Sequence, residues 1–485
     1  MPRYAETTTF SWDEVRRHSS ATDCWIVCDG CVYDISAFVP AHPGGARLWI
    51  FGGGDISVFF RAMHPPRVTV ESHLAKYYIG KVVTGQPVLG ASRMPAAIPK
   101  VSDQYLALRE FVWARLAEEL GTERLARMLQ SPKTYAAWYP CFTTLYFAAF
   151  AAIFFLPSLT LWGRALLTIP AALLAAHVSF IIHEVSHNRL RCSGVSWAIL
   201  LSDLSGFWSH AFVHEHLAHH QVQGQDLSTL AHDAPDIFEN MPFLRHRESE
   251  KLRWWHRYQH LYFLVGWSLF LVKSYLEDIY RRCRAEYVRP VNVITLLVAK
   301  LPILILLALS VYIGPFQGSD CWKPFVLLLT MLALAGCLIG LAVGVVHIGA
   351  LSASHQAAVG LPAPTYTVVG SDSADAGDFM DTIIRSTMSI VPPRTMNFIT
   401  LGLAYHVEHH LFPSMPYWLL PRVNELVTQH CAASGVRVNN RLSYTAAYCL
   451  YIEALRQLGR RPRAGAPLGA PMKAVADSAA AAEPV

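Results

Sequence analysis

Residues 402–413 read GLAYHVEHHLFP, and the HxxHH spacing inside this stretch decides how the chain is interpreted. Residues 216–220 read HLAHH and repeat that spacing, and residues 183–187 read HEVSH. On an α-helix, positions i, i+3 and i+4 share one face, so each cluster can direct its imidazoles at one point. Eight histidines at this spacing in a chain this apolar predict a metal site that performs chemistry. They are His183, His187, His216, His219, His220, His406, His409 and His410.

The composition is that of a membrane protein. Of 485 residues, 53% are hydrophobic and 15% charged, and the mean hydropathy of +0.28 is high for a soluble protein. Four apolar segments have close to the roughly 20 residues that span a bilayer, namely 135–156, 161–182, 292–313 and 325–347. With four spans, all three clusters lie on one side of the membrane.

Two further segments, 195–213 and 258–276, are ambiguous, and counting either one alone as a span would break this agreement. Segment 258–276 is flanked by aromatic and charged residues and fits an interfacial helix better. The polar N-terminus carries no signal peptide, so we expect insertion through internal segments. The scattered cysteines suit a reduced, cytosol-facing chain, and the mild net charge of +5, without a basic run, gives no reason to expect nucleic acid.

Residues 6–83 predict a small α+β domain, in which strand-like pieces at 24–27 and 31–35 alternate with helical ones. His42 begins an HPGG tetrad, and His64 follows 22 residues later. With their flanking residues, these resemble the cytochrome b5 haem-binding domain. The resemblance implies haem b with His42 and His64 as axial ligands, and His73 as a competitor for the second position. Two axial histidines leave the iron no site for oxygen, so such a haem carries single electrons.

Residues 84–103 read as a linker and residues 104–130 as one amphipathic helix outside the bilayer. We assign residues 104–455 to a membrane domain and expect disorder in the Ala- and Pro-rich tail 456–485. The predicted fold class is therefore a small α+β haem domain followed by an all-α integral membrane domain with about four transmembrane helices.

The histidine clusters, taken with residues 402–413, resemble the membrane fatty-acid desaturases of the b5-fused, front-end class over nearly all of residues 6–430. The resemblance implies two irons held mainly by histidine, with no catalytic residues beyond the metal ligands. The implied ligands are His183, His187, His216, His219, His220, His355, His406, His409 and His410. The class usually has Gln where this chain has His406, so that residue either coordinates iron or only hydrogen-bonds near it. Other departures are Glu184, Leu217 and Ala404.

The resemblance also implies a reaction and its partners. We expect O2-dependent insertion of a cis double bond into a long-chain, polyunsaturated acyl chain carried on a phospholipid or on coenzyme A. Electrons would pass from NAD(P)H through cytochrome b5 reductase to the haem. The expected location is the endoplasmic reticulum, as a multi-pass protein in the lipid bilayer with both termini in the cytosol.

Other interpretations stay open at this point. Residues 183–187 also match the HExxH motif of zinc proteases, although such an enzyme needs neither HxxHH cluster nor a haem. The same architecture serves sphingoid-base desaturases and fatty-acid hydroxylases, and the haem domain alone would suit a membrane-anchored electron carrier. For His177, His210, His214, His232 and His347 we expect packing roles more than roles behind the ligands.

Overall fold

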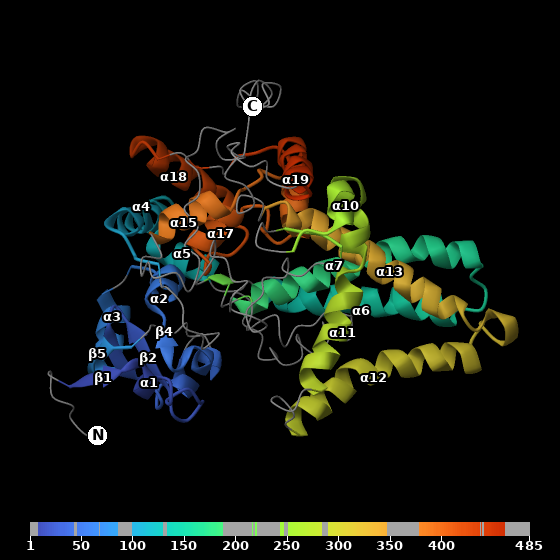
Figure 1. The fold of residues 1–485 in the computed structure, drawn as a ribbon, viewed down its shortest axis with the longest axis horizontal. Helices are drawn as coiled ribbons and strands as arrows, with labels where there is room; N and C mark the ends of the chain where they lie inside the picture. The colour runs from blue at the N-terminus through green and yellow to red at the C-terminus, as the bar shows by residue number, and fades with distance from the viewer. Residues whose placement is uncertain are drawn as a thin grey trace.

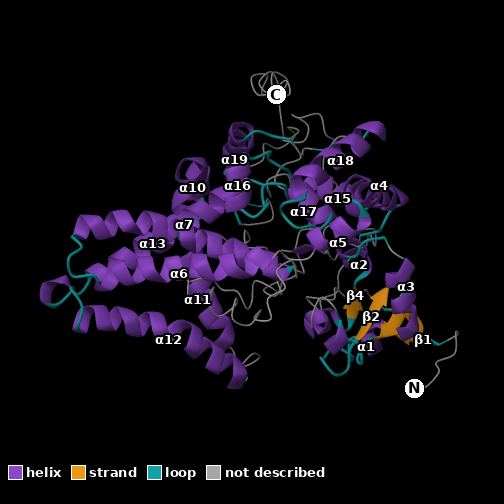
Figure 2. Ribbon diagram, turned by 180° about the vertical axis from the view of Figure 1, so that it is seen from behind, coloured by secondary structure: helices purple, strands orange, loops and turns teal. Residues whose placement is uncertain are grey.

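An N-terminal α+β domain precedes a helical domain in this computed structural model (Figure 1). The structure describes residues 8–42, 46–66, 68–85, 99–129, 133–187, 216, 219–220, 243–246, 251–283, 290–346, 378–436, 438 and 441–460. Seen from behind, the strands gather at one end of the molecule and long helices occupy the other (Figure 2).

The N-terminal domain is built on a five-stranded sheet with the order β1-β5-β3-β2-β4. Its strands are β1 (Thr9–Ser11), β2 (Trp25–Cys28), β3 (Cys31–Asp34), β4 (Gly54–Asp55) and β5 (Tyr78–Thr84). The strand-like pieces predicted at 24–27 and 31–35 correspond to β2 and β3, which pair with each other as an antiparallel hairpin. Its turn residues Asp29 and Gly30 both have positive φ, which is the conformation that an Asp-Gly hairpin turn requires. The helices of this domain are α1 (Trp12–Val15), α2 (Ser57–Met63) and α3 (Val68–Leu74).

The expected single helix over 104–130 is instead two helices, α4 (Asp103–Leu120) and α5 (Thr122–Leu129). The Ser102 side chain caps the start of α4 by accepting a hydrogen bond from the Tyr105 backbone N–H. Gly121, with φ of 76°, ends it. A glycine reaches this left-handed conformation without a Cβ penalty, which explains why the chain breaks at this residue.

Four long helices coincide with the four apolar segments. They are α6 (Lys133–Phe155), α7 (Leu161–Ser186), α12 (Pro290–Tyr312) and α13 (Lys323–Ile339), the last of which continues into a π-helical turn over Gly340–Gly344. Within the described residues, two stretches are long and apolar enough to cross a membrane, Leu161–Glu184 and Gly318–Gly344. The described apolar parts of α6 and α12 are shorter, so the predicted count of four spans is not confirmed.

The outer faces of these helices are as apolar as their packed faces. Exposed side chains include Leu145 on α6, Leu166 on α7, Leu304 on α12 and Leu329 on α13. A helix at the surface of a soluble protein would present polar residues there. Near the start of α7, the charged residue Arg164 is buried. Its guanidinium donates to the carbonyl oxygens of Ile153 and Leu156 and so closes the α6–α7 hairpin.

The remaining helices cover one end of this bundle. They are α10 (Gln259–Ser268), α11 (Phe270–Cys283), α15 (Phe379–Ser386), α16 (Arg394–Ile399), α17 (His406–Leu411), α18 (Leu420–Ala433) and α19 (Tyr444–Leu458). The ambiguous segment 258–276 is broken between α10 and α11, and exposes Leu261 and Leu276. Segment 195–213 lies outside the described residues.

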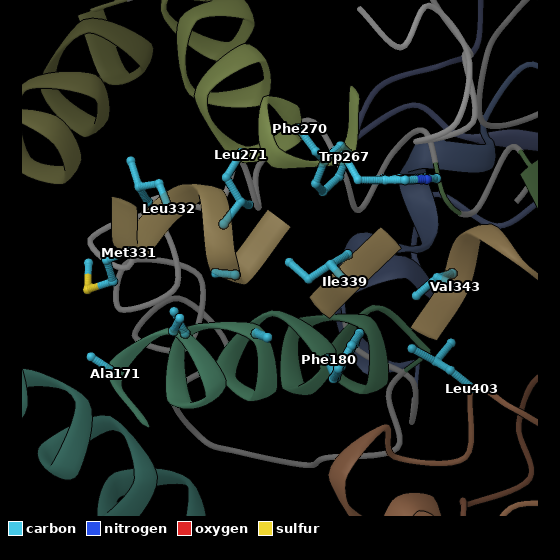
Figure 3. Packing of buried hydrophobic residues seen from close by; sticks show 14 of the residues in the cluster. Ala171, Phe180, Trp267, Phe270, Leu271, Met331, Leu332, Ile339, Val343 and Leu403 are labelled. Carbon is cyan, nitrogen blue, oxygen red and sulfur yellow. The ribbon is translucent and has the colours of Figure 1, made fainter. Parts of the chain in front are cut away.

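Close packing between α10 and α13 depends on glycine. Figure 3 shows Trp267 and Phe270 on one side of α13, with Ala171 and Phe180 of α7 on its other side. A Cβ on Gly340 would lie 2.1 Å from a ring carbon of Trp267, and one on Gly344 would lie 2.4 Å from another. The Trp267 indole N–H donates to the Tyr451 hydroxyl at 2.7 Å, which ties α10 to α19 as well. The absence of side chains at these two positions therefore makes room for the ring.

We predict that Gly340→Ala lowers the melting temperature of the detergent-solubilised protein, because the new methyl group overlaps the buried Trp267 ring. Overpacking of this kind costs about 1–3 kcal/mol. Leu329→Ala, on the exposed face of the same helix, is the control and should melt close to wild type. Equal melting temperatures for Gly340→Ala and wild type would contradict this packing.

Candidate metal centre

The first histidine cluster lies at the C-terminal end of α7. His183 and His187 are 4% and 2% exposed, and their ring centroids are 5.0 Å apart. The spacing of four residues puts both rings on one face of the helix. The longest of the apolar helices therefore delivers two imidazoles to a buried point.

The third cluster forms a short helix of its own, α17, in which every residue is buried. The turn before it passes through Leu401 and Gly402, with φ of 49° and 81°. A Cβ on Gly402 would lie 2.7 Å from the side chains of Tyr417 and Leu420. Glycine at this position thus allows the chain to turn tightly against α18 before the histidines begin.

The structure brings eight of the predicted ligands together in two adjoining groups. The ring nitrogens within each group lie within 4.8 Å of one another, and every ring is buried. One group contains His183, His187, His216, His220 and His409, and the other contains His219, His406 and His410. The groups meet where the rings of His220 and His410 stack, with centroids 4.2 Å apart. Each HxxHH cluster therefore contributes to both groups.

Four pairs of Nε2 atoms are separated by 2.8–3.1 Å, namely His183–His409, His187–His216, His216–His220 and His406–His410. Neighbouring ligands of one metal ion lie roughly 3 Å apart, because a metal–imidazole bond is about 2 Å long. A neutral imidazole has one N–H, and the His216 Nε2 atom lies in two of these contacts. Convergence on a metal ion accounts for all four distances, so the residues fit a metal.

The protonation states agree with metal binding. Burial, reinforced by His183, lowers the pKa of His406 to about 3. Burial and the surrounding histidines hold the pKa of His220 well below its usual range. Both rings are therefore neutral near pH 7 and present the lone pair that a metal requires. Imidazole donors of this kind suit iron, zinc, copper and nickel.

Two buried carboxylates stand beside the histidines. Glu408 accepts hydrogen bonds from the Ser389 hydroxyl at 2.7 Å and from the Asn424 amide at 3.0 Å. The Ser389 hydroxyl also accepts from the Val407 backbone N–H. These contacts fix α17 to α18 and to the segment before α16. A carboxylate oxygen of Glu184 lies 3.5 Å from the His183 Nδ1 atom, where it can orient that ring.

In the N-terminal domain, the rings of His42 and His64 face each other with centroids 6.1 Å apart and planes at 80°. Two imidazoles on opposite sides of one iron lie roughly that far apart, given metal–nitrogen bonds of about 2 Å. The His64 Nδ1 atom lies 2.9 Å from the Phe60 carbonyl oxygen, so Nε2 is the nitrogen available for iron. The ring of His73 packs instead 4.8 Å from that of Phe38. The residues fit a haem at the pair predicted.

Other histidines lie elsewhere. His177 lies six residues before His183 on α7. Its Nδ1 atom is 2.9 Å from the Ile399 carbonyl oxygen, and its ring packs among aromatic rings. It belongs to neither group, in agreement with a packing role. The predicted ligand His355 lies outside the described residues, as do His210, His214, His232 and His347.

Ser389 and Asn424 were not found by sequence reasoning, because nothing in their local pattern sets them apart. Their importance comes from contact with Glu408, which is 19 and 16 residues away in the chain. Glu408 itself had a signal that was overlooked. It is an acidic residue inside a cluster of metal-binding type, and such a residue is buried only when it has partners.

Comparison with known proteins agrees with these two sites. The fatty acid desaturase model matches residues 159–441, and the model of the cytochrome b5-like haem/steroid binding domain matches residues 11–83. Acyl-lipid (8-3)-desaturase B of Dictyostelium discoideum is 23% identical, over 93% of this chain and 95% of its own. Acyl-lipid (8-3)-desaturase of Physcomitrium patens is 24% identical, over 93% and 91%. The probable Delta(5) fatty acid desaturase C of D. discoideum is 24% identical, over 93% and 95%.

The first of these models covers more than half of the 485 residues and includes all three histidine clusters. The second includes both members of the facing pair His42 and His64. By this match, by the buried histidine groups and by the His42–His64 pair, the chain belongs to the fatty acid desaturase family and carries a cytochrome b5-like domain at its N-terminus.

Proposed function

We propose that this desaturase places a cis double bond in a long-chain, polyunsaturated acyl chain, using a di-iron centre and electrons from its own haem. The observation that carries the proposal is the pair of adjoining buried groups, with five and three imidazoles. Similar proteins named as acyl-lipid (8-3)- and Delta(5) fatty acid desaturases support the substrate class.

In this proposal the group of five holds one iron and the group of three holds the other. His355 is then the ninth ligand, as the resemblance implies. His406 is a ligand in this chain, because its Nε2 atom lies 3.0 Å from that of His410. When bound, the two irons supply with O2 the oxidising power needed to remove hydrogen from an unactivated methylene. Glu184, Glu408, Ser389 and Asn424 hold the imidazoles in position.

The overall reaction balances with one O2, two electrons and two protons. Two hydrogens, one from each of two adjacent methylenes, are consumed as well, and two waters form. NAD(P)H supplies the electrons through cytochrome b5 reductase, and His42 and His64 hold the haem b that passes them on. With His42 and His64 both holding the haem iron, the group would have no position free for O2 and would supply single electrons only.

The membrane arrangement in this proposal has four spans, formed by α6, α7, α12 and α13. Exposed apolar side chains along all four helices support it, as does the sequence position of the clusters after the second and fourth helices. The N-terminal domain, α17 and α18 lie at one end of these helices (Figure 1). We place that end and both termini in the cytosol, and the protein in the endoplasmic reticulum membrane.

Expression in yeast fed a panel of polyunsaturated fatty acids tests the reaction. We expect products two mass units lighter than the acid supplied, with the new double bond located by gas chromatography and mass spectrometry. Analysis of phospholipid and acyl-coenzyme A fractions at early times then identifies the carrier. A hydroxylated product would instead identify a fatty-acid hydroxylase. A new double bond confined to sphingoid bases would identify a sphingoid-base desaturase.

His409→Ala should abolish product, a loss of at least about a hundredfold, and lower the iron content of the purified protein. The haem absorbance should stay unchanged, since His409 is not a member of the His42–His64 pair. His430→Ala, which alters a histidine of α18 outside both groups, is the matched control and should keep iron and activity. Normal iron binding by His409→Ala would argue against the assigned group of five.

His406→Gln tests the residue in which this chain departs from its class. If His406 is a ligand, replacing it leaves two described imidazoles in the smaller group, so iron content and product should both fall by at least about tenfold. Full activity with full iron content would instead assign His406 a hydrogen-bonding role beside the metal.

A further inference from the structure

Helix α4 lies between the haem domain and the third histidine cluster. Its buried residues Tyr105, Leu108 and Val112 share one apolar core with residues from both sides. Val58 and Ala62 of α2 come from the haem domain, and Val407 and Leu411 come from α17. From the sequence we expected an amphipathic helix outside the bilayer, within the membrane domain. Its position between the two sites is shown only by the tertiary structure.

Near its N-terminus, α4 contacts the proposed haem ligand directly. The Arg109 guanidinium donates through Nη2 to the backbone carbonyl oxygen of His64 at 2.8 Å. Arg109 is only 5% exposed, although the helix around it is charged. His64 is the residue at which α2 ends, and Pro65 follows it. The Phe60 carbonyl oxygen of α2 holds the ring of His64, and the Arg109 guanidinium of α4 holds its main chain. Both the ring and the main chain of this proposed ligand are therefore fixed.

One turn earlier, α4 also contacts the third cluster. The Tyr105 hydroxyl, which is completely buried, donates to the backbone carbonyl oxygen of Leu411 at 2.8 Å. Leu411 directly follows His410. Tyr105 and Arg109 are four residues apart and therefore lie on the same face of α4. One helical turn thus joins the main chain of a haem ligand to the main chain beside a metal ligand.

We propose that α4 is the coupling element for electron transfer within the chain, with Arg109 and Tyr105 as its positioning residues. The inference rests on the proposed function. One electron leaves the ferrous haem, which becomes ferric, and enters the di-iron centre, and the reductase then supplies the next electron. Two such transfers, with the two electrons and two protons removed from the acyl chain and two protons from solvent, reduce one O2 to two waters. Since electron transfer slows steeply with distance, a helix that fixes the two sites sets its rate.

The experiment uses the full holoenzyme in microsomes of yeast fed a polyunsaturated fatty acid that the wild type desaturates. The haem is reduced with limiting NADH and cytochrome b5 reductase, and its reoxidation in air is followed by stopped-flow absorbance. Arg109→Met removes the donor while keeping an apolar stem, and should slow reoxidation between about tenfold and a hundredfold. Haem reduction by the reductase should be unchanged. Arg109→Lys, which retains a donor, should recover most of the rate.

Arg115→Met is the matched control, because Arg115 lies on the same helix but pairs with Glu118 at the surface. It should reoxidise like wild type. Tyr105→Phe removes only the bond to Leu411 and should slow reoxidation with haem content unchanged. This second variant decides the matter if Arg109→Met fails to retain haem.

A further readout does not depend on turnover. Arg109→Met should increase hydrogen exchange in the peptide covering α2 and change the ferric haem electron paramagnetic resonance spectrum, whereas Arg115→Met should do neither. Reoxidation, exchange and spectrum all equal to the Arg115→Met control would overturn the coupling role. If wild type forms no desaturated product, the proposed function fails, while exchange and spectrum still report whether α4 positions the haem ligand.

Discussion

Eight imidazoles buried around two adjoining points are the constraint on which the rest of this structure depends. Burying a polar ring without a partner costs free energy, and here the burial also keeps the rings neutral, as the lowered pKa of His406 illustrates. Metal ligation would offset that cost and would link metal binding to the folding of this region. The helices that carry the rings must therefore be held in one arrangement, and much of the packing serves that purpose.

The supports differ in kind for each cluster. α7 carries His183 and His187 and is packed against α6 and α13 along an apolar interface. α17 is too short to be stable alone, and it is fixed by the Glu408 carboxylate, which bonds to Ser389 and Asn424. Thus a long helix is positioned by apolar packing, while a short one relies on a buried polar network.

The α4 contacts extend this logic to the haem domain. A fused electron donor has an advantage over a separate one only if its ligand is presented at a useful distance and orientation. A flexible tether alone would raise the effective concentration of the donor without selecting an orientation. The shared core of α2, α4 and α17, together with the bonds at His64 and Leu411, provides such an orientation.

The sequence by itself determined the elements that depend on local periodicity. The apolar segments became α6, α7, α12 and α13, the Asp29–Gly30 turn set the β2–β3 hairpin, and the HxxxH spacing placed His183 and His187 in one group, because helical and hairpin geometry follow from neighbouring residues. The HxxHH spacing predicted one point for each cluster, whereas each of these clusters is divided between the two groups. The break at Gly121 was missed because a single glycine within a periodic pattern is a weak signal.

Tertiary structure alone decided which rings share a group, since His409 joins His183 while His410 joins His219 across the fold. It alone brought Ser389 and Asn424 to Glu408, and Arg109 to His64. Those contacts join residues far apart in the chain, and their energies arise only when the helices have packed.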